Sequence, residues 1–290
     1  MTYSESMPTG WPSEHTDHMH GQAAPVVAHV VIPAAGSGQR LGGGEPKALR
    51  RIGDRSLLRR CVDVFAARED IGMIVAVVPA DRVAEVDDDL NGRSDASVAA
   101  HVADDGNNSL HASVRVVAGG ASRQESVAAG LAALPDDGVP YVLVHDAARP
   151  LVPGAVVDRV VEALRAGDEA VVPGLPVVDT IKVVDESGIV VGTPPRDQLR
   201  AVQTPQGFAR ATLSAAHAQA VQAGIDATDD AGLIERLGGF VRVVPGDPLA
   251  GKITTVEDLA AMTTVAQRLE RTDSEPRSVA SGTSEREELP

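Results

Sequence analysis

The chain has 290 residues, of which 43% are hydrophobic and only 2% aromatic, and its formal charge is −15. The single cysteine, Cys61, excludes an internal disulfide framework, and the net negative charge argues against a nucleic-acid partner, whose affinity depends on basic surface. No apolar run approaches the length of about 18 residues that a membrane span needs, and the first residues carry no Lys or Arg, so we expect neither a span nor a signal peptide but a cytoplasmic protein.

Polar, aperiodic segments flank one candidate domain. Residues 1–27 mix Ser, Thr, Pro, Gly and His without periodicity, and residues 270–290 are mostly polar. Neither segment can bury enough apolar surface to fold by itself, so both are predicted to be disordered tails. The domain between them, residues 28–269, is long enough for a sizeable core of Val, Ala, Leu and Ile.

A buried strand is predicted over residues 29–32, and a loop of small residues follows it. Gly36 and Gly38 can adopt positive φ and let backbone N–H groups approach a ligand. Arg40 and Lys47 add two cations, and amides with cations suit a polyphosphate. The glycine spacing fits neither the Walker loop nor the dinucleotide fingerprint. An ordinary strand-to-helix turn is the alternative, and the two cations favour a nucleotide site over it.

The next elements follow from apolar periodicity. Residues 56–68 carry a helical apolar stripe, and residues 73–78 form a continuous apolar run typical of a buried strand. Residues 81–110 are acidic and poor in large apolar side chains, with one weak helix from Arg82. We expect this segment to be a surface insertion.

A second glycine motif follows the strand predicted at residues 114–117. Gly119 and Gly120 permit close approach to a ligand, and a Ser-x-x-Glu sequence after them is typical of a capping box. Arg123 and Ser126 are three residues apart, so they share one helix face. The alternative is a capped helix whose side chains face solvent.

A carboxylate ends the next strand, residues 141–144. Asp146 lies at the carboxyl end of this buried strand, where open α/β sheets bind ligands. It could hold Mg²⁺, which shares hard oxygen ligands with substrate phosphates. A structural ion pair between Asp146 and Arg149 is the alternative. His145 is interpreted as structural.

The second half begins with a helix over residues 154–166, a short strand and a two-stranded excursion within residues 175–200. Its strands are predicted at residues 177–184 and 189–191. A hairpin does not stabilise itself by its own contacts, so it must lie on another surface or be an exposed ribbon. Further helices are predicted over 209–222, from 228–230 to Leu237, and from Val256 onward, with a strand at 240–244.

Five motifs in residues 28–268 together resemble one enzyme family. They are the glycine loop ending in Pro46-Lys47, Gly-Gly-x-x-Arg-x-x-Ser-Val, His-Asp-Ala-Ala-Arg-Pro, Thr-Pro-Gln, and Gly-Lys-Ile-Thr. The chain resembles nucleotidyltransferases that couple a sugar or polyol phosphate to a nucleoside triphosphate. Among these it is most similar to the 2-C-methyl-D-erythritol 4-phosphate cytidylyltransferases of the non-mevalonate isoprenoid pathway.

The resemblance implies a fold, a reaction and an assembly. The fold would be a Rossmann-like α/β nucleotidyltransferase fold, with a mostly parallel twisted sheet flanked by helices and a protruding β-arm for homodimerisation. The enzyme would transfer CMP from CTP to the polyol phosphate and release pyrophosphate, with Mg²⁺ or another divalent cation as cofactor. Ribitol 5-phosphate cytidylyltransferase is the alternative, since it shares most nucleotide motifs. A non-catalytic nucleotide-sensing protein would lack the charged residues that are present here.

The resemblance also assigns roles to residues. Catalysis falls to Arg40 and Lys47, and Asp146 would bind the metal. The nucleotide-binding residues would be Pro33, Ala34, Ala35, Gly36, Ser37, Gly38, Gly119, Gly120, Arg123, Ser126, Asp146 and Ala147. The substrate-binding residues would be Asp146, Arg149, Thr180, Arg196 and Lys252, with Thr180 and Arg196 supplied across the dimer interface by the arm.

Overall fold

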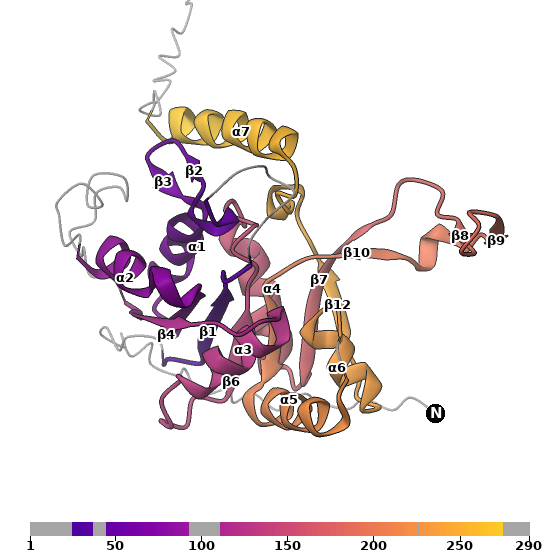
Figure 1. Ribbon diagram of the computed structural model, residues 1–290, viewed down its shortest axis with the longest axis horizontal. Helices are drawn as coiled ribbons and strands as arrows, with labels where there is room; N and C mark the ends of the chain where they lie inside the picture. The colour runs from indigo at the N-terminus through magenta and orange to yellow at the C-terminus, as the bar shows by residue number, and fades with distance from the viewer. Residues whose placement is uncertain (1–24, 37–44, 93–110, 226, 275–290) are drawn as a thin grey trace, which may run out of the picture.

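The computed structural model describes residues 25–36, 45–92, 111–225 and 227–274 (Figure 1). An eight-stranded sheet forms its centre, in the order β10-β7-β11-β6-β1-β4-β5, with β12 beside β7. The strands are β1 (Ala28–Pro33), β4 (Ile71–Val78), β5 (Ser113–Ala118), β6 (Tyr141–Val144), β7 (Ala170–Pro176), β10 (Arg200–Val202), β11 (Gln206–Ala209) and β12 (Arg242–Pro245). Neighbours from β6 to β5 and the pair β7–β12 are parallel, so the predicted α/β class is confirmed.

Two strands depart from the parallel pattern, and one of them, β10, runs antiparallel to β7 at the edge of the sheet. β11 is inserted between β6 and β7 and runs antiparallel to both. The sequence analysis predicted no strand there, because the stretch is only four residues long and contains a glycine. Its pairing with two long-range neighbours, and the full burial of Phe208, stabilise it instead.

Helices cover both faces of the sheet. α1 (Leu57–Ala66), α2 (Val83–Asn91) and α4 (Gly154–Arg165) share one apolar core with the sheet. α3 (Arg123–Ala132), α5 (Arg210–Ala223) and α6 (Asp230–Arg236) share a second core on the other face. In β1 the side chains of Val30 and Ile32 belong to the first core and that of Val31 to the second, as the alternation of a strand requires. This two-sided burial explains the continuous apolar runs in the sequence.

α1 illustrates how the sequence produces these helices. Its N-cap, Ser56, accepts a hydrogen bond from the Arg59 backbone N–H at 3.0 Å. The apolar stripe that predicted the helix places Leu58, Cys61 and Phe65 in the core. Burial raises the pKa of the Cys61 thiol, so this cysteine is a packing residue, as expected.

The acidic segment is only partly what we expected. Its first part forms α2, in which Val86 and Leu90 are buried in the core beneath the sheet. The Arg59 guanidinium donates a 2.9 Å hydrogen bond to the backbone carbonyl of Asp89. The weak helix predicted from Arg82 is therefore confirmed, but two well-spaced apolar side chains dock it on the core, so this part of the segment 81–110 is not a separate surface insertion. Residues 93–110 lie outside the described residues.

α7 (Val256–Ser274) packs across the small hairpin of β2 (Arg51–Ile52) and β3 (Arg55–Ser56). Ile52 and Leu57 meet Ile253 and Ala266 in a separate apolar cluster. The helix continues to Ser274, a few residues past the boundary expected near Glu270. The tails at 1–24 and 275–290 lie outside the described residues. In the part of the chain that is described, no helix is both long and apolar enough to cross a membrane.

The predicted arm is present and projects from the body beyond β7 and β10 (Figure 1). Its ladder is shorter than expected, with only β8 (Val183–Val184) paired to β9 (Val190–Gly192). The Asp185 carboxylate closes the turn by accepting the backbone N–H groups of Ser187 and Ile189, each at 2.9 Å. Because no other element of the described chain packs beneath β8 and β9, a longer ladder would gain little stabilisation.

Candidate active site

A cavity of about 380 Å³ opens at the carboxyl ends of the central strands. The chain leaves β1 toward β4 and β5 and later returns to β6 on the other side of β1, so this is the switch point of the sheet. Open α/β sheets bind ligands there, because the chain continues from the neighbouring strands β1 and β6 toward opposite edges of the sheet and leaves a crevice between them. Eleven of the predicted site residues line it, namely Pro33, Ala34, Ala35, Gly36, Lys47, Gly120, Arg123, Ser126, Asp146, Ala147 and Lys252.

The two glycine motifs contact each other at the floor of this cavity. A Cβ atom at Gly119 would lie 2.5 Å from the Cβ of Ala35 and 2.8 Å from the Oγ of Ser126. Gly119 itself does not line the cavity, but its missing side chain lets the β1 loop and the β5 loop come together. The predicted cap of α3 is present, with the Ser122 Oγ accepting from the Glu125 N–H at 3.1 Å.

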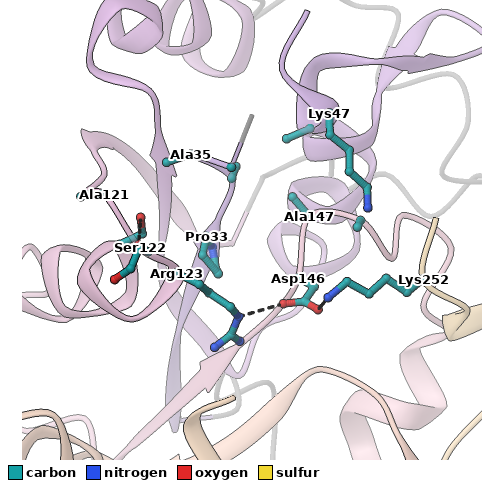
Figure 2. A pocket seen from close by; sticks show the side chains of 15 residues that line it. Pro33, Ala35, Lys47, Ala121, Ser122, Arg123, Asp146, Ala147 and Lys252 are labelled. Atoms are coloured by element: carbon teal, nitrogen blue, oxygen red, sulfur yellow. Dashed lines mark hydrogen bonds and ion pairs between the residues drawn. The ribbon is translucent and has the colours of Figure 1, made fainter. Parts of the chain in front are cut away.

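Asp146 is the centre of the charge cluster. Its carboxylate accepts from the Lys252 ammonium at 2.8 Å and from the Arg123 Nε at 3.3 Å (Figure 2). Burial acts to raise the pKa of Asp146, but Arg123, Lys252 and Arg149 outweigh it and hold the pKa well below its ordinary value. Asp146 is therefore ionised at neutral pH.

Lys47 enters the cavity from the opposite side. It begins a short 3-10 helix, η2 (Lys47–Leu49), whose middle residue Ala48 is buried against α1. Figure 2 shows its ammonium directed toward the space above Asp146 and Lys252. Among the described lining residues there are thus three cations and one carboxylate, which makes a net positive pocket in a strongly acidic chain.

Arg149 holds the wall of the pocket from outside it. Its guanidinium donates to the backbone carbonyls of Ala250 at 2.7 Å and Val202 at 3.3 Å, and its Nε is 3.8 Å from the Asp146 carboxylate. The residue is buried, burial lowers its pKa, and it does not line the cavity. The alternative interpretation, an ion pair with Asp146, describes its position better than direct substrate binding, although Arg123 and Lys252 are the closer partners of Asp146.

His145 is buried behind the pocket, as expected for a structural residue. The Thr204 hydroxyl accepts from the Asp146 N–H at 3.0 Å and therefore donates its own proton to His145 Nδ1, 3.1 Å away. His145 Nε2 then donates to the Arg149 carbonyl at 3.2 Å. Burial lowers the pKa of His145 to about 4, so the ring is neutral and supports the backbone of the Asp146 segment.

Other predicted residues are not brought to this cavity within one chain. Thr180 and Arg196 are on the exposed arm, and the Arg196 guanidinium donates to the Val178 carbonyl at 3.0 Å. Neither lines the pocket. Ser37, Gly38 and Arg40 lie outside the described residues, so their predicted roles stay predictions.

Sequence reasoning missed two buried residues behind Arg123. It interpreted residues 228–230 only as a helix cap, and Asp229 does cap α6 by accepting the Gly232 N–H at 3.0 Å. The next residue, Asp230, is not the cap, and its carboxylate pairs with the Arg123 guanidinium at 2.7 Å. His217 of α5 pairs with the same carboxylate at 2.9 Å. No local pattern predicts these contacts.

The fold and this pocket define the class as an α/β protein with a cationic site, suited to a polyanion, at the switch point of its sheet. The comparison with known families is consistent with this class. The chain belongs to the 2-C-methyl-D-erythritol 4-phosphate cytidylyltransferase family (IspD), whose model matches residues 28–268.

Individual relatives agree. The chain is 50% identical to the 2-C-methyl-D-erythritol 4-phosphate cytidylyltransferase of Nocardia farcinica over 238 residues, covering 82% of this chain and 93% of that one. It is 48% identical to that of Rhodococcus jostii, covering 81% and 92%. Among solved structures, 4-diphosphocytidyl-2C-methyl-D-erythritol synthase from Anaerococcus prevotii superposes with a TM-score of 0.69 at 28% identity, covering 84% of this chain and 99% of that one. The Thermus thermophilus cytidylyltransferase gives 0.62 at 36% identity, covering 84% and 100%.

Proposed function

We propose that this chain transfers the cytidylyl group of CTP to 2-C-methyl-D-erythritol 4-phosphate and releases pyrophosphate, a step of the non-mevalonate isoprenoid pathway. The observation that carries the proposal is the convergence of Lys47, Lys252 and Arg123 around Asp146 in one pocket. Membership of the cytidylyltransferase family identifies the base and the acceptor that this charge arrangement alone does not specify.

The reaction suits a site without a general base. An oxygen of the acceptor phosphate attacks the α-phosphorus of CTP, a new P–O bond forms, and the bond to the β-phosphate oxygen breaks. The second pKa of a phosphate monoester is about 6, so the nucleophile is already an anion at neutral pH. His145, neutral and fully buried, is not needed as a base. The task left to the protein is to hold two polyanions and to stabilise charge at phosphorus.

The positions of the two lysines indicate which phosphate each of them would contact. Lys47 faces the cavity from the β1 side and would stabilise the α-phosphate and the departing pyrophosphate. Lys252 approaches from the segment before α7 and would hold the acceptor phosphate. The adjacent Ile253 is fully buried and its N–H donates to the Ala148 carbonyl at 2.9 Å, so the Lys252 backbone is anchored.

The pocket also fits a divalent cation. Asp146 is the one carboxylate among the described lining residues, and it is ionised. No group of three or more potential metal-ligating side chains occurs in the described part of the chain. Mg²⁺ commonly binds through one or two carboxylates together with substrate phosphates, so one carboxylate suffices when the nucleotide brings the remaining oxygens. Asp146 would hold Mg²⁺, which when bound neutralises phosphate charge.

The arm supports a homodimer. Its exposed apolar side chains include Val178, Val184, Ile189, Val190 and Val191. A ribbon of this composition leaves apolar surface in water unless a second surface covers it. A second copy of the chain is the occupant we propose, with the Thr180 and Arg196 of each arm completing the acceptor site of the other subunit.

A pyrophosphate-release assay tests the proposed function. The expected result is turnover with CTP, Mg²⁺ and 2-C-methyl-D-erythritol 4-phosphate, and little or none with ribitol 5-phosphate. Lys47→Ala should lower kcat by about 10²–10³ because it removes one charge from the reacting phosphates. Arg82→Ala is the control, since Arg82 is paired with Glu85 on the surface and should retain full activity. A Lys47→Ala variant with more than about half the parental rate would contradict the assigned role.

A further inference from the structure

A chain of buried ionic contacts leads from the pocket into the second core. Arg123 contacts two carboxylates from different elements, with its Nε 3.3 Å from Asp146 and its Nη1 2.7 Å from Asp230. The second oxygen of Asp230 is 2.9 Å from the Nε2 of His217. Only Arg123 and Asp146 of these four residues line the pocket, so Asp230 and His217 do not face a nucleotide bound there.

The buried position of Asp230 suits an ion pair with a guanidinium. Its side chain is 1% exposed, whereas that of Arg123 is 30% exposed, so the anchor is inside the protein and the anchored group reaches the pocket. A carboxylate so deeply buried is costly unless both oxygens are paired, and the two partners of Asp230 meet that requirement. Burial acts to raise the pKa of Asp230, but His217 and Arg123 lower it overall, so the carboxylate is ionised.

His217 completes the anchor through its Nε2. Its Nε2 has Asp230 as partner, while its buried Nδ1 has none among the described residues. An unpaired lone pair on Nδ1 costs less than an unpaired N–H would, so the Nε2–H tautomer fits this environment. Arg123 and Lys252 are the close cationic partners of the two carboxylates.

The contact with Asp230 determines how Arg123 meets the carboxylate of Asp146 in the pocket. An arginine beside a single carboxylate forms a bidentate fork–fork pair, which is the strongest arrangement available to it. Here Arg123 donates Nη1 to Asp230 and meets Asp146 only through Nε at 3.3 Å, whereas Lys252 is the nearer partner of Asp146 at 2.8 Å. The shorter contact of Arg123 is therefore the one to the buried Asp230, which fixes one end of the guanidinium at the edge of the pocket.

We propose that Asp230, supported by His217, is a positioning residue that keeps Arg123 directed at the nucleotide. This inference rests on the proposed function, because it assigns Arg123 to the nucleotide. It couples the short helix α6 and the middle of α5 to the pocket, although neither element lines it.

A double-mutant cycle tests the proposal. Asp230→Asn keeps the shape of the side chain and should lower kcat/KM for CTP by about 10–100-fold, the range expected for one hydrogen bond to a charged group. The KM for the acceptor phosphate should stay within about twofold. In an Arg123→Gln background the same substitution should change kcat/KM for CTP by less than about threefold, because the group that Asp230 positions is already absent. Equal losses in both backgrounds, or no loss in the parental protein, would overturn the proposal.

The conservative variant of His217 provides a second measurement. His217→Gln retains an N–H donor for Asp230 and should keep at least about half of the parental kcat/KM, whereas His217→Leu should lose about tenfold. Thermal midpoints of all variants are recorded in parallel. If Gln and Leu lower kcat/KM equally at matched thermal stability, His217 does not act through the Asp230 hydrogen bond.

Calorimetric titration of CTP separates the two proposals. If the parental chain binds CTP but releases no pyrophosphate with the methylerythritol acceptor, the proposed function fails. In that case the double-mutant cycle of Asp230→Asn and Arg123→Gln, measured as CTP affinity, still tests the role of Asp230. If CTP affinity falls with Asp230→Asn only when Arg123 is present, the positioning role stands independently of turnover.

Discussion

At the scale of single residues, the pocket depends on one carboxylate among cations. The chain carries a charge of −15, yet the described lining residues of the pocket are net positive. Asp146 tolerates burial because Arg123 and Lys252 stabilise its ionised form, and it keeps those cations in place when no polyanion is bound. Under the proposed function, these cations would exchange the Asp146 carboxylate for phosphate oxygens without moving far, so the site would be preorganised.

Replacement of Asp146 should separate metal binding from nucleotide binding. Asp146→Asn keeps the size of the side chain but removes its charge, so kcat should fall by about 10²–10³ and the Mg²⁺ concentration for half-maximal rate should rise at least about tenfold. The measurement is the initial rate over a Mg²⁺ titration, with EDTA to establish the zero point. Asp158→Asn, which removes a surface partner of Arg68, is the matched control. An unchanged Mg²⁺ requirement in Asp146→Asn would contradict metal binding by this residue.

At the scale of elements, the start of α7 holds the segment that carries Lys252. The helix begins with a capping box in which the Asp258 N–H donates to the Thr255 hydroxyl at 3.2 Å, and the Asp258 carboxylate accepts the Thr255 N–H at 2.8 Å. The same carboxylate accepts the Thr254 N–H at 2.7 Å. Together with the Ile253 hydrogen bond, these bonds fix the first turn of α7 and the neighbouring pocket wall at Lys252.

The capping box predicts a pH-dependent stability difference. Hydrogen bonds from Thr254 and Thr255 lower the pKa of Asp258 to about 2. A lowered pKa means that the contribution of Asp258 to stability is fully present above its ordinary value near 4 and is lost as the pH falls toward 2. Asp258→Asn should therefore lower the urea midpoint by a constant amount from about pH 8 to pH 5, and by less at pH 3. A difference that does not shrink at pH 3 would contradict this role of the carboxylate.

At the scale of the whole molecule, the structure of a single chain does not account for the exposed apolar side chains and the predicted substrate residues of the arm. Its ladder pairs only β8 with β9, and its valines and isoleucines are exposed. The predicted substrate residues Thr180 and Arg196 are on this arm and not at the pocket of the same chain. Both observations have the same explanation if the arm lies on a second copy, because the dimer then buries the apolar ribbon and completes the acceptor site.

Subunit complementation tests this assembly. Arg196→Ala and Lys47→Ala are each expected to be nearly inactive as homodimers. Refolded or co-expressed together, they should recover about a quarter of the parental rate, since half of a random mixture is heterodimer with one intact site in two. Adding Val190→Asp to both chains should produce monomers in size-exclusion chromatography and remove the recovery. If heterodimers form without any recovery, each site is built within one chain.

The sequence predicted more of the fold than of the site. Apolar periodicity placed α1, β6, α4 and α5 to within a few residues, because helices and buried strands here bury regular stripes. It failed for β11, which is too short for a period. It predicted the helix α2 but not its docking on the core, for which two apolar residues in an acidic helix were enough. At the site, the loop after β1 and the carboxylate after β6 were predicted, since both follow directly from strands.

By itself, the amino-acid sequence determined the local units of this protein: which runs are strands, which loops carry glycine and charge, and that Asp146 stands at a strand end. These depend on neighbours within a few residues. Only the tertiary structure decided that Arg149 turns away to brace Val202 and Ala250, that Arg196 lies on an arm, and that Arg123 meets Asp230 across 107 residues of sequence. Such contacts depend on how separate helices and strands pack, and burial selects among partners that no local pattern distinguishes.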